Sequence, residues 1–262
     1  MTTLVYLYAV LGHSLDVSLT GIDGQPIRWV EGDHLAAAVS DVPGEDFEEE
    51  PLNANVRDMA WLGPRAVAHQ DVNASLFEAS TAIVPLAFGT VFRDDARVRQ
   101  LLIEQVTRLQ AQLERVRDCA EWVVALHALR EPGADEVATD SPQVQSLRQQ
   151  IEASPPGRAH LLRRQLSTLE RDEARRIQGE AGAQILASLR SAAVDVFQEP
   201  LPSDAVERPL LRASVLVRRD AEAIFMDEVE HLRERWPEPA YRLLLTGPWP
   251  PYRFAGLQRD AV

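Results

Sequence analysis

The sequence predicts an α+β fold in two domains, and three observations support this prediction. The length of 262 residues exceeds that of one ordinary compact domain. Short apolar runs at 4–11, 27–30 and 35–39 have the composition of strands. A second series of strand, helix and strand patterns follows residue 209. The order of these patterns predicts an N-terminal ferredoxin-like α/β sandwich, with helices on one face of an antiparallel sheet. A C-terminal α+β domain with a long helical hairpin and a small sheet follows it.

The N-terminal half begins with a predicted buried strand, Leu4–Leu11, and a hairpin formed by the next two runs. The acidic segment Gly44–Pro51 is interpreted as a solvated surface loop. Helices are expected over 53–80 and 98–116, the second starting at Asp94 and Asp95. The remaining expected strands are short pieces at 81–84 and 89–92 and a longer apolar run at 122–129.

Composition places the boundary between the domains after residue 130. Residues 131–143 contain Pro, Gly and several acidic residues, which is typical of a linker. The predicted domains are therefore 1–130 and 144–262. The second contains helices at 143–153 and 158–196, a strand at 210–218, a helix at 220–235 and a strand at 241–245.

Charge and residue usage exclude several classes of function. The chain has 40 acidic and 27 basic residues, a formal net charge of −13, which disfavours nucleic-acid binding. It contains no Lys, so lysine-dependent nucleotide, Schiff-base and pyridoxal sites are excluded. The single Cys119 cannot form an internal disulfide. No basic residue precedes Arg28 and residues 79–92 are too short to span a bilayer, so we expect a cytoplasmic protein without membrane contact.

No catalytic or metal-binding motif is found. The six histidines lack metal-ligand spacing, and no nucleophile elbow or glycine-rich phosphate loop is present. His69 with Asp71 comes nearest to a site, and we interpret His69 as a residue on a helix surface. We therefore expect no enzyme activity, no cofactor and no metal, and interpret the protein as a binding or assembly module.

Several motifs resemble those of the gas vesicle protein F/L family. They are the opening strand at 5–10, the segment from His69 through 83–92, Glu121-Trp122, the helix start at 156–158, and the terminal motif at 245–254. Ala87 stands where family members commonly carry Arg, so no role is carried over to that position. The resemblance implies an accessory protein for gas vesicle assembly, located in the cytoplasm and at the gas vesicle. It also implies that the partners are the hydrophobic shell protein or other gas vesicle proteins.

Two alternatives stay open at this point. The tail residues Pro248, Trp249, Pro250, Pro251 and Tyr252 could pin the C-terminus to the folded body, which we favour, or could contact a partner. The apolar segment 83–92 is likewise expected to be core rather than interface. The alternative function is a nucleic-acid-binding or regulatory ferredoxin-like module.

Overall fold

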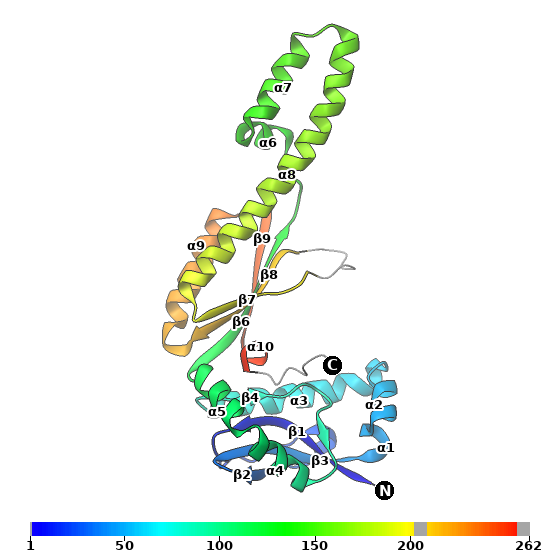
Figure 1. Ribbon diagram of the computed structural model, residues 1–262, viewed down its shortest axis with the longest axis vertical. Coiled ribbons are helices and arrows are strands. Elements are labelled where there is room, and N and C mark those ends of the chain that lie inside the picture. Colours follow the sequence, from blue (N-terminus) through cyan, green and yellow to red (C-terminus); the bar gives the residue numbers. More distant parts are fainter. Residues whose placement is uncertain (1, 202–208, 256–262) are drawn as a thin grey trace. The chain divides into compact units, whose positions relative to one another are not determined.

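A computed structural model describes residues 2–201 and 209–255 of the chain (Figure 1). The chain divides into two compact units, each made of separate stretches. The first unit comprises Met1–Trp122, Leu216–Asp220 and Gly247–Val262, and the second comprises Val123–Val215 and Ala221–Thr246. The expected boundary at residues 130 and 131 differs from this division, because Leu216–Asp220 and the C-terminal residues group with the first unit.

The first unit contains an antiparallel sheet centred on β1 (Thr3–Leu11). The strand order is β2 (Arg28–Gly32), β3 (Leu35–Pro43), β1 and β4 (Val84–Pro85), and β5 (Val91–Phe92) also pairs with β1. The predicted opening strand, hairpin and short strand pieces are all present. The register of β1 against β3 shifts between Leu7 and Ala9, as at a β-bulge.

Helices cover both faces of this sheet, which corrects the expectation of helices on one face. The β1 side chains alternate: Tyr6 reaches α3 (Met59–Ala79), whereas Leu7 belongs to the core shared with α4 (Asp95–Glu104) and α5 (Val106–Arg115). Residues of both parities along β1 are therefore buried. The α+β class itself is confirmed.

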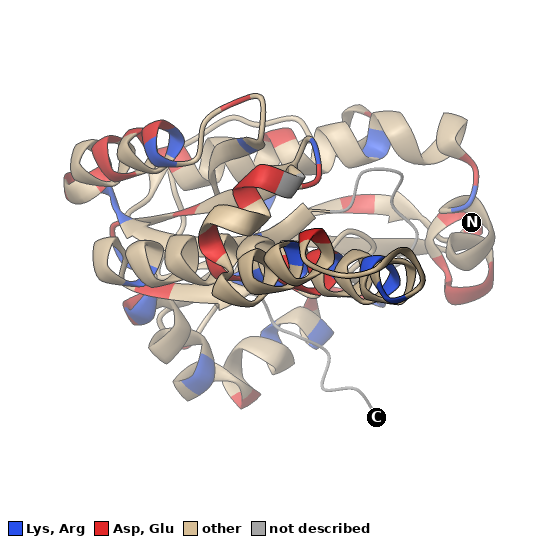
Figure 2. Cartoon of the chain, turned by 90° about the horizontal axis from the view of Figure 1, so that it is seen from above, with Lys and Arg blue, Asp and Glu red and all other residues tan. Residues whose placement is uncertain are grey.

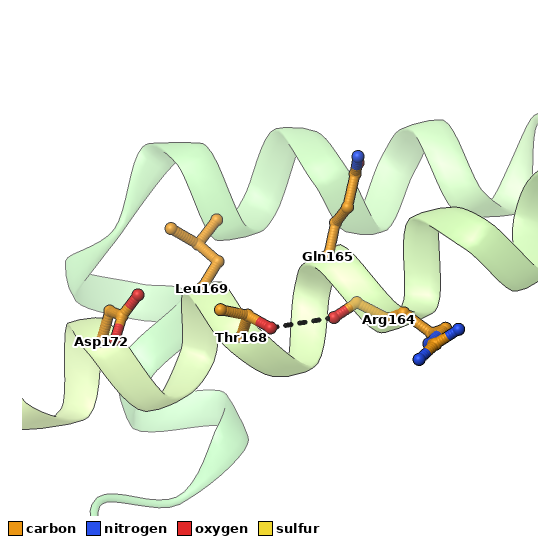
Figure 3. A pocket seen from close by; sticks show the side chains of 5 residues that line it. All are labelled: Arg164, Gln165, Thr168, Leu169 and Asp172. Carbon is orange, nitrogen blue, oxygen red and sulfur yellow. Dashed lines mark hydrogen bonds between the residues drawn. The ribbon is translucent and has the colours of Figure 1, made fainter.

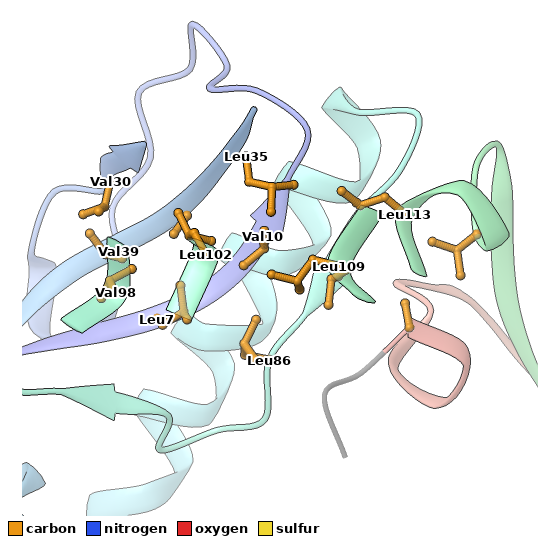
Figure 4. Close-up of a cluster of buried hydrophobic side chains, with 14 of the residues drawn as sticks. Leu7, Val10, Val30, Leu35, Val39, Leu86, Val98, Leu102, Leu109 and Leu113 are labelled. Carbon is orange, nitrogen blue, oxygen red and sulfur yellow. The ribbon is translucent and has the colours of Figure 1, made fainter. Parts of the chain in front are cut away.

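The main hydrophobic core of the first unit lies between β1–β3 and the pair α4–α5 (Figure 4). Val98, Leu102 and Leu109 are fully buried. Asp94 caps α4, because its Oδ1 accepts a hydrogen bond from the backbone N–H of Arg97 at 2.9 Å. The single helix expected over 98–116 is interrupted at Gln105, whose φ of −105° and ψ of 12° separate α4 from α5.

The acidic segment 44–51 is largely helical, not a loop. It contributes α1 (Gly44–Phe47) and the start of α2 (Glu49–Asn55). Phe47 is fully buried, with its ring centroid 5.8 Å from that of Tyr6, so this one apolar side chain fixes the segment to the core. Charged residues surround Phe47 in the sequence, so the hydrophobic pattern did not predict that Phe47 is buried.

A four-stranded sheet has the order β7 (Asp195–Gln198), β8 (Pro209–Arg218), β6 (Cys119–Ala128) and β9 (Tyr241–Trp249), and most of its residues belong to the second unit. Strand β7 was not anticipated, because four residues are too few for a pattern. Residues 213–217 of β8 are all buried, and so are Phe225 and Val229 of α9 (Glu222–Arg235). The turns η1 (Ile22–Gly24) and η2 (Arg219–Ala221) complete the short elements.

A helical hairpin belongs to the second unit, as predicted. It consists of α7 (Pro142–Glu152) and the long helix α8 (Pro156–Ala192). The expected linker 131–143 instead contains α6 (Ala134–Asp140). Glu136 Oε2 accepts from the backbone N–H of Gly133 at 2.8 Å and pairs with Arg130, contacts that lower the pKa of Glu136 to about 2. The acidic residues that indicated a linker therefore cap a helix.

Basic and acidic residues are interspersed on the helices (Figure 2). No helix among residues 2–201 and 209–255 is long and apolar enough to cross a membrane.

Candidate functional site

The C-terminal tail, defined here as residues 247–255, belongs to the first unit. The hydroxyl of Tyr252, in the short helix α10 (Tyr252–Ala255), donates a hydrogen bond to Oε1 of Gln70 at 3.1 Å. The backbone N–H of Arg253 donates to Oε2 of Glu121 at 2.7 Å. Glu121 is 6% exposed, so this N–H takes the place of water as a hydrogen-bond donor to its carboxylate. The tail is thus a tertiary element of the first unit.

Phe254 is the apolar anchor of the tail. Its side chain is 6% exposed and belongs to the same core cluster as Leu109 and Leu113 of α5. The guanidinium carbon of Arg115 lies 6.0 Å from the centroid of the Phe254 ring. Trp249 and Tyr252 were expected to anchor the tail, whereas the anchoring role of Phe254, two residues beyond Tyr252, was not anticipated.

Gly247 begins the tail at a position where only glycine fits. Its φ is +138°, and a Cβ atom there would lie 2.8 Å from Cε3 of Trp122 and 2.9 Å from the carbonyl oxygen of Glu121. The backbone therefore packs directly against the Trp122 ring, which sets where the tail starts.

The five residues singled out in the sequence fall into two groups. Pro250 and Pro251 are buried and Tyr252 is half-buried, so these three lie against the first unit. Pro248 is exposed, and the Trp249 side chain is 40% exposed. Pinning and partner contact can thus belong to different residues of one short motif.

A buried polar network links β1 and α3, and the tail is hydrogen-bonded to the same helix. The Tyr6 hydroxyl lies 2.9 Å from Nδ1 of His69, and Nδ2 of Asn73 lies 3.1 Å from Nε2 of the same ring. The Tyr252 hydroxyl of the tail donates to Gln70, the residue that follows His69 in α3, and burial raises the Tyr252 pKa.

The hydrogen bonds define the state of His69. Nδ2 of Asn73 is a donor only, so Nε2 of His69 accepts and Nδ1 carries the proton toward the Tyr6 oxygen. Burial lowers the pKa of His69 to about 4, which outweighs a hydrogen bond with the Leu86 backbone that raises it. The imidazole is neutral at physiological pH and serves as a structural hydrogen-bonding group.

His69 is therefore not on the helix surface, which corrects the sequence interpretation. It is 5% exposed, while Asp71 is exposed. Val72 follows His69 by three residues and Leu76 follows Asn73 by three, and both are buried. This shared helical spacing was a signal that two polar residues lie on the buried face of α3.

Within residues 2–201 and 209–255, no three or more His, Cys, Asp or Glu side chains are grouped to hold a metal ion. Burial raises the pKa of the Cys119 thiol, which keeps it protonated. Segment 83–92 is largely buried at Ile83, Val84 and Leu86, as expected for core.

Two shallow hollows lie elsewhere on the described surface. One is lined by Arg164, Gln165, Thr168, Leu169 and Asp172, all from α8 (Figure 3). The other lies where β1 and the β2–β3 hairpin end, with His13, Glu31 and His34 among its lining residues. Neither includes a residue of the tail.

Comparisons with known proteins agree along the whole chain. It is 34% identical over 266 residues to gas vesicle protein L of Streptomyces sp. (strain CB03234), covering 99% of this chain and 95% of that protein. It is 30% identical to gas vesicle protein F of the same strain, covering 97% and 99%.

The fold matches a solved structure too. The crystal structure of the gas vesicle protein GvpF from Anabaena sp. PCC7120 superposes with a TM-score of 0.72 at 19% identity, covering 97% of this chain and 98% of that one. The family described as gas vesicle synthesis protein GvpL/GvpF matches residues 4–256. The chain therefore belongs to the gas vesicle synthesis protein GvpL/GvpF family.

Proposed function

We propose that this protein is a non-enzymatic accessory factor that binds the hydrophobic gas vesicle shell protein, or other gas vesicle proteins, while vesicles form in the cytoplasm. The observation that carries the proposal is the family match over residues 4–256. A physical reason supports it. Shell subunits with apolar surfaces aggregate before assembly, and an acidic partner with net charge −13 can cover such a surface while remaining dispersed.

Within the tail, we propose that Trp249 makes the contact with the partner protein and that Pro248 lies beside this contact. A rigid aromatic side chain that is 40% exposed offers apolar area at little entropic cost on binding. Pro250, Pro251 and Tyr252 hold the tail on the first unit. Trp249 is thereby presented from a fixed backbone, which reduces the entropy lost on binding.

The nucleic-acid alternative is less well supported. Ferredoxin-like domains that bind RNA stack bases on aromatic residues of an open sheet face. Here Tyr6 and Tyr8 of β1 have no exposed surface, and the Tyr8 ring is stacked on His69 of α3. The aromatic residues of this strand are therefore covered by a helix.

Co-purification with the shell protein tests the proposal. Tagged wild-type protein should retain the shell protein, and Trp249→Ala should retain much less while melting at nearly the same temperature. Leu244→Ala is the matched control, because Leu244 is 44% exposed on the same strand. Failure of the wild type to retain any gas vesicle protein would refute the function. Equal retention by the two variants would remove only the assignment to Trp249.

A further inference from the structure

An exposed face of α8 carries Arg158, Leu161, Arg164, Gln165 and Thr168. Their spacing of three and four residues places them on one side of the helix. All five are exposed, and Leu161 is 62% exposed. We refer to these five residues as the α8 face. It runs into the shallow hollow in which Leu169 lies beside Arg164 and Thr168 (Figure 3).

This face lies in a basic stretch of an acidic protein. Residues 153–169 contain three Arg and no Asp or Glu, although the chain as a whole has 40 acidic residues. Further along α8, Arg176 is paired with Glu173 at 2.7 Å and with Glu180 at 2.6 Å. By contrast, Arg158, Arg163 and Arg164 form no ion pair with any residue that the structure describes. Unpaired guanidinium groups beside an exposed Leu make a surface suited to an acidic, partly apolar partner.

The same chain offers a complementary surface. Glu45, Glu48, Glu49 and Glu50 are exposed on or beside α1 and α2, and they too form no ion pair within the described residues. Each copy thus carries both a basic face and unpaired carboxylates, on different units. This makes a second copy the most available acidic partner.

We propose that the α8 face binds the acidic surface of a second copy of this chain, with the carboxylates of Glu45, Glu48, Glu49 and Glu50 against Arg158 and Arg164. Each copy carries one surface of each kind, so the contact can pair two copies reciprocally or repeat from copy to copy. Exposed ion pairs are individually weak and are screened by salt, so the association is concentration-dependent and reversible.

Analytical ultracentrifugation of the full chain tests this directly. The wild type should gain mass above its 29.2 kDa monomer as concentration rises at about 0.02 M salt, where charges interact over long distances. It should return to monomer at about 1 M salt, where the screening length is about 3 Å. A monomer at every concentration in low salt, or an oligomer insensitive to salt, would overturn the proposal.

Charge reversal identifies the surfaces. Arg158→Glu with Arg164→Glu should abolish the low-salt association, and so should Glu48→Arg with Glu49→Arg. The control Arg99→Glu with Arg108→Glu makes the same charge change at exposed positions of α4 and α5 and should leave it intact. Glu is a good helix former, and circular dichroism checks that α8 persists.

Mixing the two reversed proteins gives the decisive outcome. Each variant alone repels itself, but the acidic surface of the first fits the unchanged α8 face of the second, so the mixture should associate again. A mixture that stays monomeric contradicts the pairing. Binding of wild type to duplex DNA at physiological salt, lost in the Arg158/Arg164 variant, would show that the face serves a nucleic acid instead.

Discussion

Tyr252 donates a hydrogen bond to Gln70 although 182 residues separate them. With the bond from Arg253 to Glu121, it fixes α10 to the unit in which the chain begins. The C-terminal motif is therefore part of the architecture of the first unit, and its residues can be tested one by one.

Phe254→Ala should destabilise the first unit more than Trp249→Ala does. Phe254 is 6% exposed and Trp249 is 40% exposed, so only the first leaves a cavity in the core. The expected loss for Phe254→Ala is about 3–5 kcal/mol of unfolding free energy. Urea denaturation of both variants measures it, and an equal or larger loss for Trp249→Ala would contradict the division of roles.

Tyr252→Phe removes one hydroxyl and keeps the ring. Because that hydroxyl donates to Gln70, the expected cost is about 1–2 kcal/mol. Gln70→Ala removes the other partner, and a double-mutant cycle should show the two losses to be non-additive. Strict additivity would mean that the bond does not contribute to stability.

Gly247→Ala should destabilise the tail despite adding only a methyl group. The new Cβ would lie 2.8 Å from the Trp122 ring, and φ of +138° is unfavourable for any other residue. Gly157→Ala is the control, because no atom lies within 4 Å of a Cβ there. Thermal melting should fall for the first variant and stay level or rise for the second.

His69 should make stability fall in mild acid. Its folded pKa, about 4, lies below the unfolded value near 6.5, so between these values the unfolded chain binds the additional proton. Stability from this group is complete above pH 6.5 and declines as pH falls toward 4, by up to roughly 3 kcal/mol. His69→Gln should flatten that part of the profile, whereas the exposed His160→Gln should leave it unchanged.

The fragment 1–130 tests the domain boundaries expected from the sequence. It lacks Leu216 and Phe254, which belong to the core of the first unit. We expect it to lose cooperative unfolding, whereas residues 1–130 joined through a flexible linker to 216–220 and 247–262 should retain more protection in hydrogen exchange. A cooperative fragment 1–130 would instead support the boundary at 130.

Helices and strands with a regular hydrophobic periodicity were predicted from the sequence. Strand β1, the β2–β3 hairpin, the long helix α8 and strand β8 each repeat one spacing long enough to identify, and the resemblance of the terminal motif indicated the family. The structure differs from the predictions where one or two residues determine the local structure. Phe47 turns an acidic segment into helix, Glu136 caps α6, and His69 and Asn73 place polar atoms on a buried helix face.

Tertiary contacts account for the remaining differences. No local pattern could show that Phe254 packs with Leu109, or that Gly247 meets Trp122, because these pairs are distant in sequence. For the same reason the tail could be recognised as a motif but not divided into buried and exposed members.

The path of the chain also sets the order in which the protein can be completed during translation. The polypeptide passes from one unit to the other at 122–123, 215–216, 220–221 and 246–247. A ribosome that has made the first 246 residues has not yet supplied Phe254 or Tyr252. The core of the first unit therefore cannot close until residues 252–254 have been made, although most of that unit is synthesised much earlier, and until then its apolar surface is open to chaperones or to early partners.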